Sequence, residues 1–127
     1  MSHQTEYKAA EMDDLNALAK AAKELGFTLE EADLYRGYGG RMHECTHRIC
    51  MDGCPYDVGI HAKDGKVQSM ATDWYAGHVK RCIGEGYSKL KQMYGVVRAE
   101  AEARRHGFTV RRETKGEQIL LTIGGIR

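Results

Sequence analysis

The residues of this chain best suited to chemistry are histidines and cysteines gathered between positions 43 and 54. Three of the four cysteines and two histidines lie there, in the order His43, Cys45, His47, Cys50 and Cys54. In an extended strand the side chains alternate between faces, so the first three of these would share one face. Zinc takes four nitrogen or sulfur ligands in a tetrahedron, and the predicted set is Cys45, Cys50, Cys54 and His47.

Other interpretations of the same stretch stay open. His43 or Cys82 could replace His47 as the fourth ligand, and an iron–sulfur cluster would require Cys82 because it needs all four cysteines. Cys50 and Cys54 flank a turn and could form a redox pair, although the reducing cytosol disfavours a permanent bond between them. The Cys-x4-Cys-x3-Cys spacing matches neither a zinc knuckle nor a common ferredoxin motif, so half-buried cysteines without a metal are the favoured interpretation.

No catalytic residue is predicted. A cysteine nucleophile would need a histidine that lowers its pKa, and His61 is the candidate for Cys45 or Cys54. The sequence supplies no recognisable orienting group or oxyanion hole, and it has no P-loop or Gly-x-Gly-x-x-Gly motif. It therefore favours a protein that is not an enzyme.

A second group of residues, rich in arginine and aromatic side chains, is a candidate contact surface. Arg36, Tyr38 and Arg41 alternate with glycines, and Trp74 follows a later strand. Such a segment could stack on bases and bind phosphates, although a glycine-rich bend in a strand explains it better. The 19 basic and 18 acidic residues of the chain leave a net charge of +1. Because nucleic-acid-binding proteins usually carry a basic excess, we expect a protein partner, and a nucleic-acid-binding module remains the alternative.

The first elements that must position these residues are a strand and a helix. A strand is expected within residues 4–12, and Asp13 or Asp14 then caps a helix that ends at Gly26. The apolar residues of this helix recur at helical spacing: Leu15, Leu18, Ala19, Ala22 and Leu25.

Short extended runs and a second helical region follow. After a short extended piece at 27–29, strands are expected over residues 34–38, 41–51, 56–61 and 66–72, with a hairpin turn at Asp52-Gly53. The helical region after Trp74 is softly broken by glycines, and its apolar face contains Tyr87, Leu90, Tyr94, Val97 and Ala101. The charged residues around its end are expected on a solvated face: Glu100, Glu102, Arg104, Arg105, Arg111, Arg112 and Glu113. Strands over 108–113 and 118–123 complete the chain as a hairpin.

The order β-α-β-β-β-β-α-β-β predicts an α+β fold. Strands linked by hairpins favour one continuous antiparallel sheet, with the two main helices packed on one of its faces. The chain has 127 residues, so we expect residues 1–127 to form a single domain. No apolar run approaches the roughly 20 residues of a membrane span, and the N-terminus lacks the apolar core of a secretory signal. We therefore expect a cytoplasmic protein that makes no membrane contact, whose oligomeric state stays open.

Four motifs carry a resemblance to a known family. They are Met1-Ser2-His3, Leu25-Gly26-Phe27, Arg36-Gly37-Tyr38 with Gly40, and Tyr56-Asp57-Val58-Gly59 followed by Ala71-Thr72-Asp73-Trp74. In order and spacing the chain resembles the uncharacterised hypothetical chloroplast reading frames of algal plastids, cyanobacteria, other bacteria and phages. The resemblance covers most of the chain and implies a small accessory protein of unassigned activity, sometimes encoded beside an AAA-type ATPase. An adaptor or regulator with a protein partner is the expected function, while the Cys/His stretch at 43–54 is not a usual feature of that family.

Overall fold

The computed structural model describes residues 4–8 and 12–126. The strands are β1 (Gln4–Lys8), β2 (Thr28–Glu31), β3 (Leu34–Arg36), β4 (Met42–Glu44), β5 (His47–Cys50), β6 (Val58–Lys63), β7 (Lys66–Asp73), β8 (Phe108–Lys115) and β9 (Gln118–Ile126). The helices are α1 (Leu15–Glu24), α2 (His78–Ile83) and α3 (Ser88–Arg105), and short 3₁₀ turns lie at Tyr38–Gly40, Tyr75–Gly77 and Glu85–Tyr87. None of the helices in these ranges combines the length and the apolar character that a membrane crossing requires.

Helix α1 forms where the sequence predicts it. Asp14 is its N-cap, and its Oδ1 accepts a hydrogen bond from the backbone N–H of Ala17 at 3.1 Å. Gly26 follows the helix at φ +88°, a conformation that favours glycine. The buried residues of α1 form one stripe: Ala17, Leu18, Ala21 and Ala22. The capping residue is therefore confirmed, and so are Leu18 and Ala22 of the predicted stripe, whereas Leu15, Ala19 and Leu25 are only partly buried.

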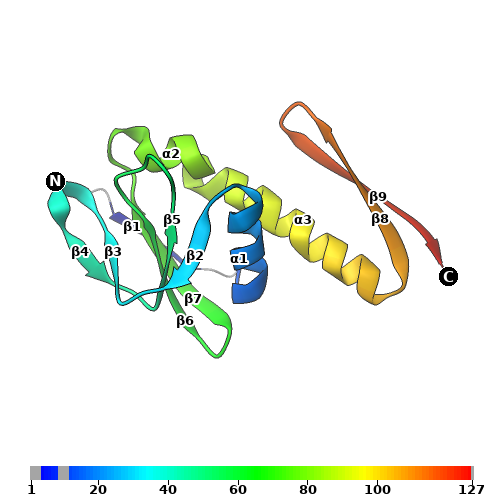
Figure 1. Cartoon of the computed structure of the whole chain (residues 1–127), viewed down its shortest axis with the longest axis horizontal. Coiled ribbons are helices and arrows are strands. Elements are labelled where there is room, and N and C mark those ends of the chain that lie inside the picture. The colour runs from blue at the N-terminus through cyan, green and yellow to red at the C-terminus, as the bar shows by residue number, and fades with distance from the viewer. Residues whose placement is uncertain (1–3, 9–11, 127) are drawn as a thin grey trace.

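The strands confirm the predicted α+β class but divide into three antiparallel sheets among the described residues (Figure 1). One has five strands in the order β1-β7-β6-β5-β2, and the pairs β3-β4 and β8-β9 are separate. The prediction of one continuous sheet is wrong because the expected strand over 41–51 breaks at Cys45 and Thr46. The N–H of Cys45 bonds to the carbonyl of Asp33, whereas the next N–H, of Thr46, bonds to the carbonyl of Ile60 in β6. The chain thus passes from one sheet into another at this point.

The helices and the β3-β4 hairpin lie on opposite faces of the five-stranded sheet. The shared core joins all three helices to alternate strand residues such as Ile49, Val58 and Ile60. Gly59 lies between two of these, so its position faces the other side of the sheet, where the ring of Tyr35 in β3 covers it. This arrangement confirms that the two main helices, α1 and α3, pack on one face.

Helix α3 buries two faces rather than the single face that the sequence predicts. Leu90, Tyr94 and Val97 are buried as expected, while Ala101 is exposed. A second buried row, about 100° away around the helix, contains Met93, Val96, Glu100 and Ala103. The β8-β9 hairpin explains this row, because it lies on the side of α3 away from the five-stranded sheet (Figure 1).

Candidate functional site

The first feature of the site is an ion pair between β3 and the loop that precedes β6. Asp57 is fully buried, and its carboxylate accepts hydrogen bonds from the backbone N–H of Arg36 at 2.9 Å and from Nη2 of Arg36 at 2.8 Å. The same Nη2 donates to the carbonyl of Cys54 at 3.1 Å. The hydrogen bond to Asp57 raises the pKa of Arg36 above its ordinary value. A buried carboxylate needs such partners, and here they fix an arginine whose side chain stays 45% exposed.

A second buried carboxylate, Asp73 at the end of β7, holds two tyrosine-bearing turns together. Its Oδ2 accepts the backbone N–H of Tyr38 at 3.1 Å, and its Oδ1 accepts the backbone N–H of Tyr75 at 3.0 Å. The rings of these tyrosines meet edge to face, with centroids 4.6 Å apart. Segments 35 residues apart in the chain are therefore joined through one side chain.

More aromatic side chains surround this point. The ring of Tyr56 meets that of His78 edge to face at 5.6 Å, and Trp74 meets Tyr87 in the same manner at 5.1 Å. Desolvation and the nearby carboxylate of Asp73 raise the pKa of Tyr56, so its phenol keeps its proton. Trp74 is half-buried and packs against the core, so it contributes to packing rather than to a contact surface.

The residues predicted as a contact surface are partly brought together. Arg36 bonds to Asp57, and the backbone of Tyr38 bonds to Asp73. Arg41 is exposed in the same hairpin, and Trp74 lies beside Tyr75 but packs inward. Two exposed apolar residues that the sequence did not indicate join them: Met42, paired with Arg36 across the hairpin, and Tyr75. We name this the tyrosine–arginine surface, and it consists of Arg36, Tyr38, Arg41, Met42 and Tyr75.

The predicted metal ligands occupy separate surroundings. The thiol of Cys45 donates to the carbonyl of Ala32 at 3.3 Å, and the thiol of Cys50 lies 3.7 Å from Oε2 of Glu30. Cys54 is buried in the core. The histidine candidates for the fourth ligand have other neighbours: His47 contacts Thr46 at 3.0 Å, and His43 packs on Tyr35 with ring centroids 5.1 Å apart. Cys82, the cysteine alternative, lies on α2 beside Cys54. Within residues 4–8 and 12–126, no three His, Cys, Asp or Glu side chains are grouped to hold a metal ion.

Burial also keeps the thiols of this region protonated. Desolvation is the largest cause that raises the pKa of Cys45, Cys50 and Cys54. A hydrogen bond shared with Cys82 raises the pKa of Cys54 further. Metal binding and nucleophilic attack both require thiolate, so these surroundings favour packing over chemistry. The thiol in contact with Cys54 comes from α2, a pairing that the spacing of residues 43–54 could not reveal.

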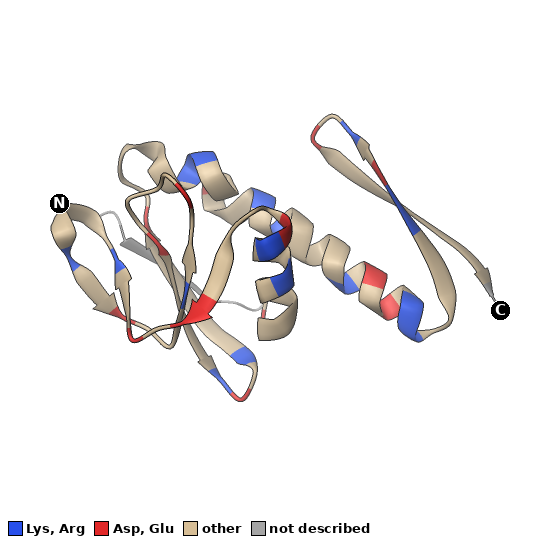
Figure 2. Ribbon diagram, in the orientation of Figure 1, with Lys and Arg blue, Asp and Glu red and all other residues tan. Residues whose placement is uncertain are grey.

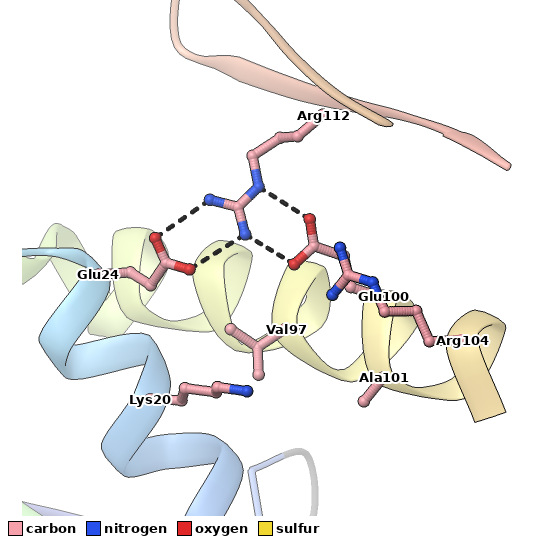
Figure 3. Close-up of a pocket in the computed structure, with 7 residues that line it drawn as sticks. All are labelled: Lys20, Glu24, Val97, Glu100, Ala101, Arg104 and Arg112. Carbon is pink, nitrogen blue, oxygen red and sulfur yellow. Dashed lines mark hydrogen bonds and ion pairs between the residues drawn. The ribbon is translucent and has the colours of Figure 1, made fainter. Parts of the chain in front are cut away.

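A second polar cluster joins the C-terminal hairpin to the helices (Figure 3). Arg112 of β8 donates to both carboxylate oxygens of Glu24 in α1 at 3.1 Å, and to those of Glu100 in α3 at 3.0 and 2.7 Å. Glu100 is buried, and Lys20 and Arg104 help line the same pocket of about 420 Å³. The prediction that Glu100 and Arg112 lie on a solvated face is therefore wrong. No local pattern marks this cluster, because its three members come from three elements.

Comparison of the chain with models of protein families, with curated proteins and with solved structures gives no match. The resemblance to the hypothetical chloroplast reading frames thus stays a prediction that rests on the motifs. In the structure the Arg36-Gly37-Tyr38 motif contacts two others, through Arg36 with Asp57 and Tyr38 with Asp73.

Proposed function

We propose that this chain is a cytoplasmic, non-enzymatic adaptor that binds a protein partner through the tyrosine–arginine surface. One observation carries the proposal: the fully buried Asp57 bonds the guanidinium of exposed Arg36, and the fully buried Asp73 bonds the backbone of Tyr38 and Tyr75, whose rings pack on each other. Tyrosine and arginine are enriched among the residues that dominate binding energy at protein interfaces. Side chains that are already ordered lose less entropy when a partner binds.

The composition of the surface favours a protein over nucleic acid. The guanidinium of Arg36 is already bonded to Asp57, so a phosphate would have to compete for it. Met42 and Tyr75 are 47% and 40% exposed, and such apolar area suits the centre of a protein interface. Arg41 adds an exposed positive charge, so we expect an apolar partner surface with acidic groups at its edge. An AAA-type ATPase is the first candidate, because the resemblance implies one.

Purified protein carrying Tyr75→Ala or Arg41→Ala tests this proposal. The unmodified chain, immobilised and exposed to an extract of its host, should retain a protein partner, and titration calorimetry with that purified partner should give its affinity. Tyr75→Ala should weaken binding at least tenfold, which corresponds to about 1.4 kcal/mol. Arg111→Ala serves as the control for Arg41→Ala, since Arg111 is exposed on β8 outside this surface. Recovery of nothing but the chain itself, or equal loss with the control, would contradict the proposal.

A further inference from the structure

The C-terminal strand β9 has an open edge of unusual composition. Among the described strands it pairs with β8 alone. Its nine residues, from Gln118 to Ile126, include no charged side chain, whereas β8 carries Arg111, Arg112, Glu113 and Lys115. Figure 2 shows the contrast, with blue and red segments on β8 and none along β9. The two strands of one hairpin therefore present very different edges.

An open strand edge exposes backbone N–H and C=O groups that can pair with another strand. Proteins usually protect such edges with charged residues, proline, bulges or covering elements. The edge strands of the five-stranded sheet, β1 and β2, follow this rule in their composition, since β1 contains Glu6 and Lys8 and β2 contains Glu30 and Glu31. β9 lacks charge and proline, and its Leu120 and Ile123 are 41% and 51% exposed. A two-stranded sheet is also only marginally stable without further packing.

We propose that a second copy of this chain binds at the β9 edge, so that two hairpins form one antiparallel sheet in the order β8-β9-β9-β8. A two-fold axis pairs a strand with itself in antiparallel orientation, and each copy then contributes the same surface. If a charged strand paired with itself in this way, like charges of the two copies could lie opposite each other, which is destabilising. β9 contains no charged residue, so this repulsion does not arise. The partner that best matches an uncharged strand edge of this kind is therefore the same edge of another copy.

The side chains of β9 support a register centred on Leu121. Ile119, Leu121 and Ile123 alternate along the strand and share the face that contains Arg112 and Val110 of β8. With the axis at Leu121, Ile119 lies opposite Ile123 of the second copy, and these residues form one apolar row that covers the exposed Ile123.

The position of the hairpin is compatible with this assembly. Arg112 fastens β8 to α1 and α3, and among the described strands the edge of β9 away from β8 has no strand partner. The hairpin lies at the opposite end of the long axis from β3 and β4, which carry part of the tyrosine–arginine surface (Figure 1). Association of two copies would thus leave that surface accessible, and the inference is independent of the proposed function.

Sedimentation equilibrium of the full chain tests the inference directly. The unmodified protein should show twice the 14.3 kDa chain mass at high concentration and dissociate on dilution. Thr122→Lys, an exposed change on β9, should raise the dimer dissociation constant at least tenfold, because a lysine at a strand edge opposes pairing. Thr114→Lys makes the same change at an exposed position of β8 and should leave the constant unaltered.

A charge-reversal experiment separates edge pairing from damage to the hairpin. Thr122→Lys and Thr122→Glu should each dimerise poorly alone, because the like charges lie near each other across the axis, and an equal mixture of the two should recover the dimer. A chain that stays monomeric at every concentration would overturn the inference. So would equal weakening by Thr114→Lys, failure of the mixture to recover, or growth into open-ended assemblies.

Discussion

At the scale of single residues, position 59 requires a glycine because the ring of Tyr35 covers it. A Cβ at this position would lie 2.1 Å from Cε1 of Tyr35, which is far inside contact distance. Gly59→Ala must displace either the ring or strand β6, and we expect a loss of about 1–3 kcal/mol in the free energy of unfolding. Urea denaturation measures this loss. Because Tyr35 belongs to β3, the same change should also loosen the β3-β4 hairpin.

Gly95 provides the matched control for this substitution. It lies within α3, and nothing comes within 4 Å of a Cβ built there. Gly95→Ala should stabilise the protein by about 0.5–1 kcal/mol, since glycine is a poor helix former. Similar effects of the two substitutions would show that the contact between Tyr35 and Gly59 is not important for stability.

The three thiols with raised pKa predict a loss of stability in alkali. Cys45, Cys50 and Cys54 keep their protons in the folded state beyond the ordinary thiol pKa of about 8.5, whereas the unfolded chain releases them there. The stabilisation is therefore complete below about pH 8.5 and declines as the pH rises through the folded values. Urea denaturation at about pH 7 and about pH 9.5 should show this decline. Cys54→Ala should reduce the decline, and an unchanged pH dependence would contradict the assigned cause.

At the scale of elements, the β8-β9 hairpin depends on the cluster around Arg112. Arg112→Gln would leave the buried carboxylate of Glu100 without its ion pair, because no other residue is hydrogen-bonded to it among the contacts of the described chain. We expect the local opening free energy of β8 and β9 to fall by about 1–3 kcal/mol. Hydrogen exchange should detect the change in the hairpin while the amides of β6 and β7 stay protected. Arg111→Gln, on an exposed neighbour, should have little effect.

Acid should weaken the same cluster. The hydrogen bond from Arg112 lowers the pKa of Glu24, so its carboxylate stabilises the folded state above the unfolded pKa of about 4.3. This contribution is lost as the pH falls through the lower, folded value. Hydrogen exchange of the hairpin near that pH should therefore increase more in the unmodified chain than in Arg112→Gln. Equal increases in both proteins would exclude Glu24 as the cause.

At the scale of the whole molecule, the separation of the cysteines predicts independence from metal. The break at Cys45 and Thr46 sends the chain from the β3-β4 sheet into β5, so the histidines and cysteines of this stretch enter different layers. Protein purified without chelator should contain substoichiometric zinc and iron by elemental analysis, and EDTA should leave its melting temperature unchanged. One bound metal per chain, with a lower melting temperature in EDTA, would contradict this expectation and support the metal site predicted from the sequence.

The sequence alone determined the elements whose information is local. Helix α1 could be predicted because a capping aspartate, an apolar spacing and Gly26 all act within a few residues. The Asp52-Gly53 turn and the C-terminal hairpin follow from turn chemistry in the same way. Together these elements were sufficient to predict the α+β class.

Only the tertiary structure decided where the remaining side chains lie, because their partners are distant in the chain. Arg36 meets Asp57 across 21 residues, Tyr38 meets Asp73 across 35, and Arg112 meets Glu24 across 88. The second buried face of α3 likewise depends on a hairpin that follows the helix and folds back over it. The periodicity of a segment shows which of its residues share a face. Which other element covers that face depends on packing and on the pairing of buried charges between segments that are distant in the chain.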